Sequence, residues 1–481
     1  MTVRALLWKD LRIFTDVFAA GIALLLGSYF LAFLLVYSGG AKEFSWSSVF
    51  AGGASLARFT SILISALLGA YAFAYENEDR SSLFLASLPA DRRTIVFSKA
   101  LIAVSAFAMI WLTSLTVLLT GMRAMGVEWS TLKLVLEGMV GYAASGAMAF
   151  GVSWALSLKM ASPVGAALAG LVSLMPVYLL QIAANEHFGI ENPMFFHPIA
   201  LVLMTCACFA GVGSGGIAYI RTGGVPQTET RRRWQRARTV AWELGELQTP
   251  KAASFHALLW KDAALLSTSF RVGVAVVAAP YLVVLTSPDK ATVFRGASLV
   301  AAALLALVAS FWSGHLMSAE STSRTGESLA YLPARRSTRI FARLSVLLTP
   351  VSTMSLLNLG ILLTANSAIP GSIRLGANFT WTNWQNAPYL IIGMCLANAG
   401  LVGCSLSWLV SAKYRRPAMA IVVGVMTAFS GMAVFGALSS LCVASPDILT
   451  PTGFVACYTA GSLGISSLLF GLGSVQGDKP N

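Results

Sequence analysis

Acidic and basic side chains crowd together in two short segments of an otherwise apolar chain. One segment runs from Glu76 to Lys99 and the other from Glu320 to Arg343. With a constant offset of 244 residues and no gap, charged positions and a Leu-Pro-Ala motif coincide in the two segments. Each segment lies between apolar stretches long enough to cross a bilayer. The chemistry that these residues offer is ionic docking, so we expect a soluble partner to bind here.

Residue patterns for catalysis are missing from the rest of the sequence. The chain has no Gly-x-x-x-x-Gly-Lys-Ser/Thr phosphate loop and no His-Glu-x-x-His motif. His187 and His197 could bind a metal together with Glu186 and Glu191, but isolated loop histidines usually do not. We therefore expect no catalytic residues, no metal site and no cofactor, and we expect that the protein is not an enzyme.

The composition is that of an integral membrane protein. Hydrophobic residues make up 56% of the chain and charged residues 11%, with a mean hydropathy of +0.73. Water-soluble domains carry about 25% charged residues. The net charge of +13 does not indicate nucleic-acid binding, because bases near membrane spans are expected on the cytoplasmic side.

Apolar stretches of suitable length predict an all-α protein with about twelve transmembrane helices. The expected spans cover residues 17–37, 52–75, 95–121, 134–158, 162–184, 196–220, 269–287, 293–317, 340–366, 388–412, 416–440 and 452–474. If both termini are cytoplasmic, 26 of the 33 lysines and arginines lie inside. This bias predicts a multi-pass protein of the inner (cytoplasmic) membrane.

Further landmarks recur in the same order and predict two parallel six-helix repeats. Leu7-Trp8-Lys9-Asp10 returns as Leu259-Trp260-Lys261-Asp262, and Ser153-Trp154 with Pro163 returns as Ser407-Trp408 with Pro417. Apolar residues around the first motif have helical spacing, which favours an interfacial amphipathic helix before each repeat. A simple extension of the following span is the alternative. Copies that both start inside are related by an axis along the membrane normal.

A polar linker divides the predicted halves. Residues 1–221 form the first half, residues 222–253 a basic cytoplasmic linker, and residues 254–481 the second half. The linker bases are typical of a solvated segment that rests on anionic lipid headgroups, although such a run could also bind RNA or an acidic partner. We expect contact with lipid and none with nucleic acid.

Few polar side chains lie within the predicted spans. Asn358 and Asn398 lie deepest, and we take them as candidates for a translocation path. Amides at such depth also hydrogen-bond neighbouring helices for purely structural reasons. So few intramembrane acids argue against proton or sodium coupling, and they suit an apolar or amphipathic cargo.

Each half of the chain resembles the permease of a type-2 ABC exporter. The resemblance rests on an interfacial helix, six spans, and a charged segment between spans two and three. The resemblance implies that this segment forms a coupling helix which docks on a separate ATPase subunit. It implies roles in coupling for Glu76, Arg80, Leu88, Pro89 and Arg92, and for Glu320, Arg324, Leu332, Pro333 and Arg336. Leucines would fill a pocket while the charges fix the register.

Separate ABC ATPase subunits, two in number, are the partners that the resemblance implies. Because both halves are joined in one chain, a single chain could complete the channel, while pairing of two chains is a second arrangement. The family also implies a re-entrant hairpin before the sixth span. Residues 185–198 suit it in the first half better than 439–451 do in the second.

Two other functions fit parts of the pattern. A major-facilitator secondary transporter also has twelve spans in two parallel halves, but residues 76–93 lack the glycines of its Gly-x-x-x-Asp-Arg-x-Gly-Arg-Arg loop. A membrane scaffold or sensor would use the linker to recruit partners.

Overall fold

The computed structural model is helical throughout the residues that it describes. These are residues 3–38, 46–78, 91–126, 129–160, 162–178, 180–181, 198–222, 250–285, 290–322, 336–368, 388–414, 423–424 and 451–477.

The helices follow the order of the expected spans. The first half contains α1 (Val3–Ser38), α2 (Trp46–Tyr71), α3 (Ala74–Glu78), α5 (Arg92–Ala124), α6 (Trp129–Ser157), α7 (Pro163–Val172) and α9 (Pro198–Thr222). The second half contains α11 (Pro250–Ala278), the 3-10 helix η1 (Ala279–Leu285), α12 (Lys290–Thr322), α14 (Arg336–Ala368), α15 (Pro388–Tyr414) and α17 (Pro451–Gly477).

Seven helices of the described part are long and apolar enough to cross a membrane. A bent pair, Phe255–Ala264 with Ser269–Leu282, raises that number to as many as eight. The expected fifth and tenth spans correspond to two shorter apolar helices, Pro163–Tyr178 and Leu396–Ala412. The expected span 416–440 lies outside the described residues, apart from residues 423–424. An α-helical membrane protein is therefore confirmed, and the number twelve stays a prediction.

The segment before the first span is not a separate helix in the first half. α1 runs without a break from Val3 to Ser38, because no proline interrupts it and its buried stripe continues from Leu6 through Phe14 to Val17. In the first half, the residues before the expected span therefore continue that span and do not form a separate helix. In the second half the two parts of the bent pair differ in direction by 62°.

Local sequence accounts for where two of the helices begin. Ser162 accepts a hydrogen bond from the backbone N–H of Gly165 and caps α7, with Pro163 at the first position of the helix. At this position proline suits the helix, because no intrahelical partner is available for an N–H group there. Asp91 caps α5 in the same way by accepting from the N–H of Arg93.

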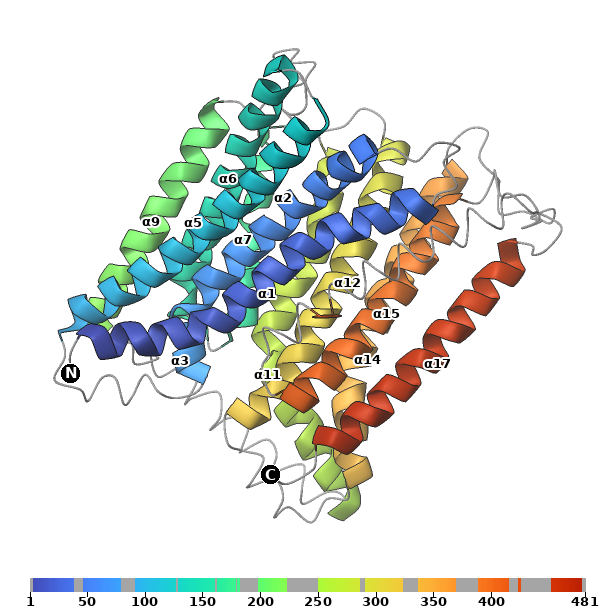
Figure 1. Ribbon diagram of the computed structural model, residues 1–481. Helices are drawn as coiled ribbons and strands as arrows, with labels where there is room; N and C mark the ends of the chain where they lie inside the picture. The colour runs from blue at the N-terminus through green and yellow to red at the C-terminus, as the bar shows by residue number, and fades with distance from the viewer. Residues whose placement is uncertain are drawn as a thin grey trace.

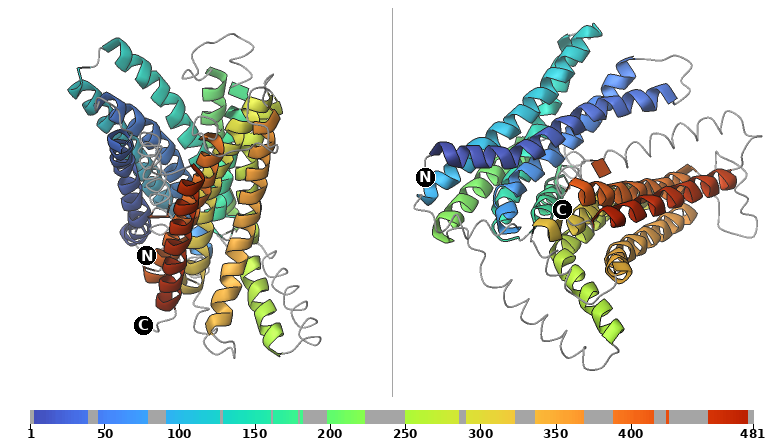
Figure 2. Two further views of the ribbon diagram at one scale, coloured as in Figure 1. Left: turned by 90° about the vertical axis from the view of Figure 1, so that its right-hand side faces the viewer. Right: turned by 60° about the horizontal axis from the view of Figure 1, so that its bottom comes forward.

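Two groups of helices pack around one continuous apolar core (Figures 1 and 2). α2 packs against α1, α6 and α7, whereas α12 packs against α14 and α15, and α15 against α17. The groups meet where α7 lies against α11. Trp154, Trp312 and Trp408 are the largest side chains buried in the core. The start of α1 and the end of α17 lie toward the same end of the bundle (Figure 1).

Candidate functional site

The two ends of the first charged segment lie close together, where α3 and α5 meet. α2 ends at Tyr71, and a two-residue turn leads into the short α3, which carries Glu76. Lys99 lies two turns into α5, on the helix that follows the segment. The two side chains meet with 2.7 Å between Lys99 Nζ and Glu76 Oε1. The tertiary structure thus closes the segment at its two ends.

The start of α1 completes this base. Lys9 Nζ donates to Glu76 Oε1 at 2.5 Å, and Lys99 Nζ lies 3.5 Å from Asp10 Oδ1. The second carboxylate oxygen of Asp10 accepts a hydrogen bond from the Ser98 hydroxyl at 2.5 Å. We call Lys9, Asp10, Glu76 and Lys99 the first-half cluster. It joins α1, α3 and α5 with two positive and two negative groups.

Burial makes these contacts strong. Glu76, Asp10 and Lys99 are each no more than 2% exposed. Lys99 also donates to the Ala72 carbonyl at 2.9 Å, and its ammonium lies 5.6 Å from the centroid of the Phe73 ring. A buried charge is tolerated only when it is paired and hydrogen-bonded, and each charge here has several partners.

The charge on Glu76 is stabilised by its neighbours. Burial alone would raise the pKa of this carboxyl. The ammonium groups of Lys99 and Lys9 outweigh burial and hold the pKa of Glu76 below its usual value. Glu76 is therefore ionised at neutral pH and acts as an ion-pair partner, not as a proton donor.

Arg92 occupies a different place from Glu76, although both were predicted to bind the same partner. Its side chain is exposed, and its guanidinium donates to the carbonyls of Ile220 at 3.0 Å and Arg221 at 3.4 Å. These carbonyls belong to the last turn of α9, where unpaired carbonyl groups and the helix dipole favour a cation. Arg92 thus ties the start of α5 to the end of α9.

The structure describes only two of the remaining predicted coupling residues. Glu320 lies near the end of α12, and Arg336 is the first residue of α14. The other six lie outside the described residues: Arg80, Leu88, Pro89, Arg324, Leu332 and Pro333. Their role in coupling stays a prediction.

Lys9 and Asp10 are cluster members that the sequence did not assign to the site. Their motif recurs as Leu259-Trp260-Lys261-Asp262, and its spacing indicates only a helix. The signal was the recurrence of an adjacent Lys-Asp pair in both halves beside the recurring Glu76 and Lys99 positions. Sequence spacing alone does not show that these residues meet.

A related set of charges occurs in the second half. Arg343, equivalent to Lys99, lies 4.0 Å from Asp262, which is equivalent to Asp10. Lys261 Nζ lies 3.7 Å from the other carboxylate oxygen of Asp262. We call Lys261, Asp262 and Arg343 the second-half cluster. All three come from positions whose equivalents form the first-half cluster.

Apolar contacts also recur at equivalent positions. The ring centroids of Tyr29 and Phe50 lie 6.0 Å apart, and those of Tyr281 and Phe294 lie 6.2 Å apart. A Cβ placed on Gly215 would lie 2.7 Å from Cδ1 of Trp154. One placed on Gly473 would lie 2.6 Å from Cδ1 of Trp408. In each half, a helix passes close to a buried tryptophan only because it carries a glycine there.

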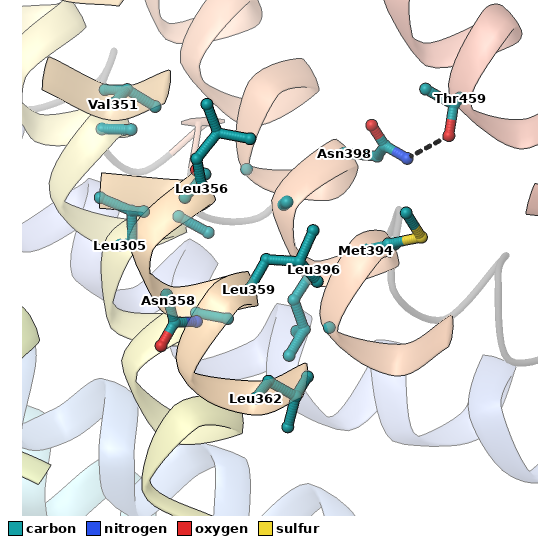
Figure 3. Close-up of a pocket in the computed structure, with 17 residues that line it drawn as sticks. Leu305, Val351, Leu356, Asn358, Leu359, Leu362, Met394, Leu396, Asn398 and Thr459 are labelled. Atoms are coloured by element: carbon teal, nitrogen blue, oxygen red, sulfur yellow. Dashed lines mark hydrogen bonds between the residues drawn. The ribbon is translucent and has the colours of Figure 1, made fainter. Parts of the chain in front are cut away.

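Asn358 and Asn398 line the same cavity in the second half (Figure 3). The Asn358 amide donates to the Ser298 carbonyl at 2.9 Å and accepts from the Tyr281 hydroxyl. The Asn398 amide donates to the Thr459 hydroxyl at 2.9 Å. Both amides therefore bridge helices, as the structural alternative predicted, and both also border an open space.

Comparison with known proteins identifies one family. Residues 6–219 match the family described as ABC-2 family transporter protein. Curated proteins give no match to this chain. The matched residues extend from α1 to α9 and include the whole first-half cluster. The match covers less than half of the chain, and over residues 6–219 the chain is similar to the membrane proteins of the ABC-2 transporter family. Together with the apolar helices, it indicates a multi-pass membrane protein.

Proposed function

We propose that this chain is the membrane permease of an ATP-driven exporter whose ATP hydrolysis takes place on two separate ABC ATPase subunits. The segments that begin at Glu76 and Glu320 bind these subunits from the cytoplasm. The family match over residues 6–219 supports the permease role. The charge bias of the sequence supports cytoplasmic termini and an inner-membrane location.

The first-half cluster is the observation that carries this proposal. A loop that transmits a push needs a stiff base, because a flexible base would absorb the displacement. The buried Glu76–Lys99 ion pair fastens the two ends of the segment to each other, and Lys9 and Asp10 fasten them to α1. Arg92 extends the base to α9. Movement of the segment would therefore reach four helices at once.

Within this proposal the predicted residues divide into two roles. Glu76 is buried, so it positions the segment and does not touch the partner. Arg80, Leu88 and Pro89 belong to the part of the segment that would contact the ATPase. In the second segment, Arg324, Leu332 and Pro333 would contact the ATPase.

We also propose that the chain is a fusion of two parallel permease halves. The recurrence of the Tyr–Phe pair, the Trp–Gly contact and the Asp–base pair at equivalent positions supports this arrangement. With two halves in one chain, one chain offers two docking segments. Asn358 and Asn398 would belong to the second half alone, because Ser114 and Ala144 occupy the equivalent positions.

The test reverses one charge in each docking segment. The affinity-tagged protein is purified from its own membranes, and ATP hydrolysis and co-purifying proteins with a phosphate loop are measured. Arg80→Glu with Arg324→Glu should reduce both at least tenfold, because each variant reverses a charge that the proposal assigns to the docking contact. Arg123→Glu, an exposed site at the other end of α5, is the control. Undiminished ATPase recovery and transport in the double variant would rule out docking through these segments.

A further inference from the structure

A cavity of about 180 Å³ lies among α12, α14, α15 and α17 (Figure 3). Its wall is largely apolar and includes Leu305, Val351, Leu359 and Leu396. A dry cavity of roughly 150 Å³ is large enough to hold benzene. This space is therefore sufficient for part of a hydrocarbon chain, and it lies in the middle of the predicted spans.

The first half has a tryptophan where the second half has this space. Trp111 is equivalent to Ser355, which lines the cavity. Trp111 Nε1 donates to the Ser65 hydroxyl at 3.1 Å. A Cβ placed on Gly146 would lie 2.5 Å from Cζ2 of the same indole.

The neighbours of this indole support the correspondence of the two places. The equivalents of Ser65 and Gly146 are Ala309 and Gly400, and both line the cavity. The indole in the first half therefore fills the volume that is open in the second half.

A second pair of side chains fills the same region of the first half. The Arg58 guanidinium lies 5.3 Å from the centroid of the Tyr142 ring. Their equivalents, Ala302 and Leu396, also line the cavity. The second half thus has smaller side chains at the positions of the tryptophan, the arginine and the tyrosine. The helices that surround these positions are present in both halves.

A lipid from the surrounding bilayer is the molecule that we expect to fill this cavity. α14 contributes Val351, Ser355 and Leu359 to the wall. Its Leu356 also lines the cavity and is 68% exposed, and the next residue, Leu357, is 64% exposed. A helix with such a surface in a membrane protein faces hydrocarbon, which is as apolar as leucine. The side chains that line an empty cavity lack dispersion contacts on the side of the cavity. An acyl chain that enters from the bilayer would supply these contacts.

We propose that this cavity is a binding site for one acyl chain of a membrane lipid, inserted between α14 and α15 from the bilayer. Ser355 and Asn398 are polar residues of the wall. The proposal stands apart from ATPase docking, because it depends on the packing of the second half and not on the charged segments.

The test uses vesicles of phosphatidylethanolamine and phosphatidylglycerol that contain a lipid with a diazirine in mid-chain. After illumination, peptides of the reconstituted full chain are mapped by mass spectrometry. Label is expected on cavity residues of α12 and α15 and on the outer face of α14. The variant Ser355→Trp with Ala309→Ser recreates the Trp111–Ser65 pair and should reduce cavity label at least fivefold. Leu357→Trp places the same bulk on the exposed face and should leave cavity label unchanged.

The reciprocal variant keeps the test decisive if the filled cavity disturbs folding. Trp111→Ser opens the equivalent place in the first half and should produce label on α2 and α6 peptides, which wild type lacks there. Melting temperature and elution volume verify that each variant is folded. Label confined to outward-facing residues in wild type would overturn the proposal, as would cavity label that persists in the filled variant.

Discussion

The two charged clusters use equivalent positions but differ in how tightly they are held. In the first half the Lys99 side chain is 2% exposed and lies 3.5 Å from Asp10. In the second half the Arg343 side chain is 12% exposed and lies 4.0 Å from Asp262. Ser98 donates a hydrogen bond to Asp10, whereas Ala342 occupies that position in the second half and has no donor.

This difference teaches that equivalent charges do not guarantee equivalent energies. Burial and hydrogen bonding decide how much an ion pair contributes, because an exposed pair is screened by solvent and a buried one is not. The same holds for the apolar positions, where Trp111 fills in one half what Ser355 leaves open in the other. The described ion pair of Lys99 with Asp10 is shorter than that of Arg343 with Asp262, and the cavity lies in the second half.

The largest expected effect separates the two clusters directly. Lys99→Met should destabilise the protein by about 3 to 5 kcal/mol, because it leaves two buried carboxylates without their shared partner. Arg343→Met should cost less, about 1 kcal/mol, because its contact with Asp262 is 4.0 Å long and Asp262 keeps Lys261 at 3.7 Å. Denaturant titration in detergent micelles measures both, with Lys133→Met on an exposed site of α6 as the control. Equal losses at the two positions would show that the clusters do not differ in strength.

A smaller effect concerns the missing hydroxyl. Ser98→Ala should cost about 1.5 to 3 kcal/mol, because Asp10 loses a hydrogen bond to a charged oxygen. Ala342→Ser should gain about 1 kcal/mol by supplying Asp262 with the donor that Asp10 already has. The same titration detects both changes. No gain from Ala342→Ser would indicate that the second-half carboxylate lies in a different environment.

The smallest effect is a dependence on pH that is confined to acid. The pKa of Glu76 in the folded protein lies below its usual value of 4.5. A depressed carboxyl pKa contributes stability that is complete above pH 4.5 and is lost as pH falls through the folded pKa. The difference in melting temperature between wild type and Glu76→Gln should therefore stay constant from about pH 8 to pH 5, and shrink only in more acidic buffer. A difference that shrinks near neutral pH would contradict this assignment.

Several features could be predicted because they depend only on local sequence. Apolar length predicts the helices, and Pro163 after Ser162 predicts where α7 begins. The recurrence of Glu76 and Lys99 as Glu320 and Arg343 marks the charged segments without any knowledge of the fold. The sequence leaves open whether the start of α1 is an interfacial helix or an extension of the span, because a helix that lies on the membrane and one that enters it share the same apolar periodicity.

Hydropathy and residue identity are local properties, and they suffice to indicate a helical membrane protein whose charged segments recur. The contacts of Lys9 and Asp10 with Glu76 and Lys99, and of Arg92 with the end of α9, emerge only in the folded chain. The same is true of the cavity that Asn358 and Asn398 border. These contacts join residues far apart in the chain, and their distances follow from how whole helices pack, which no local spacing encodes.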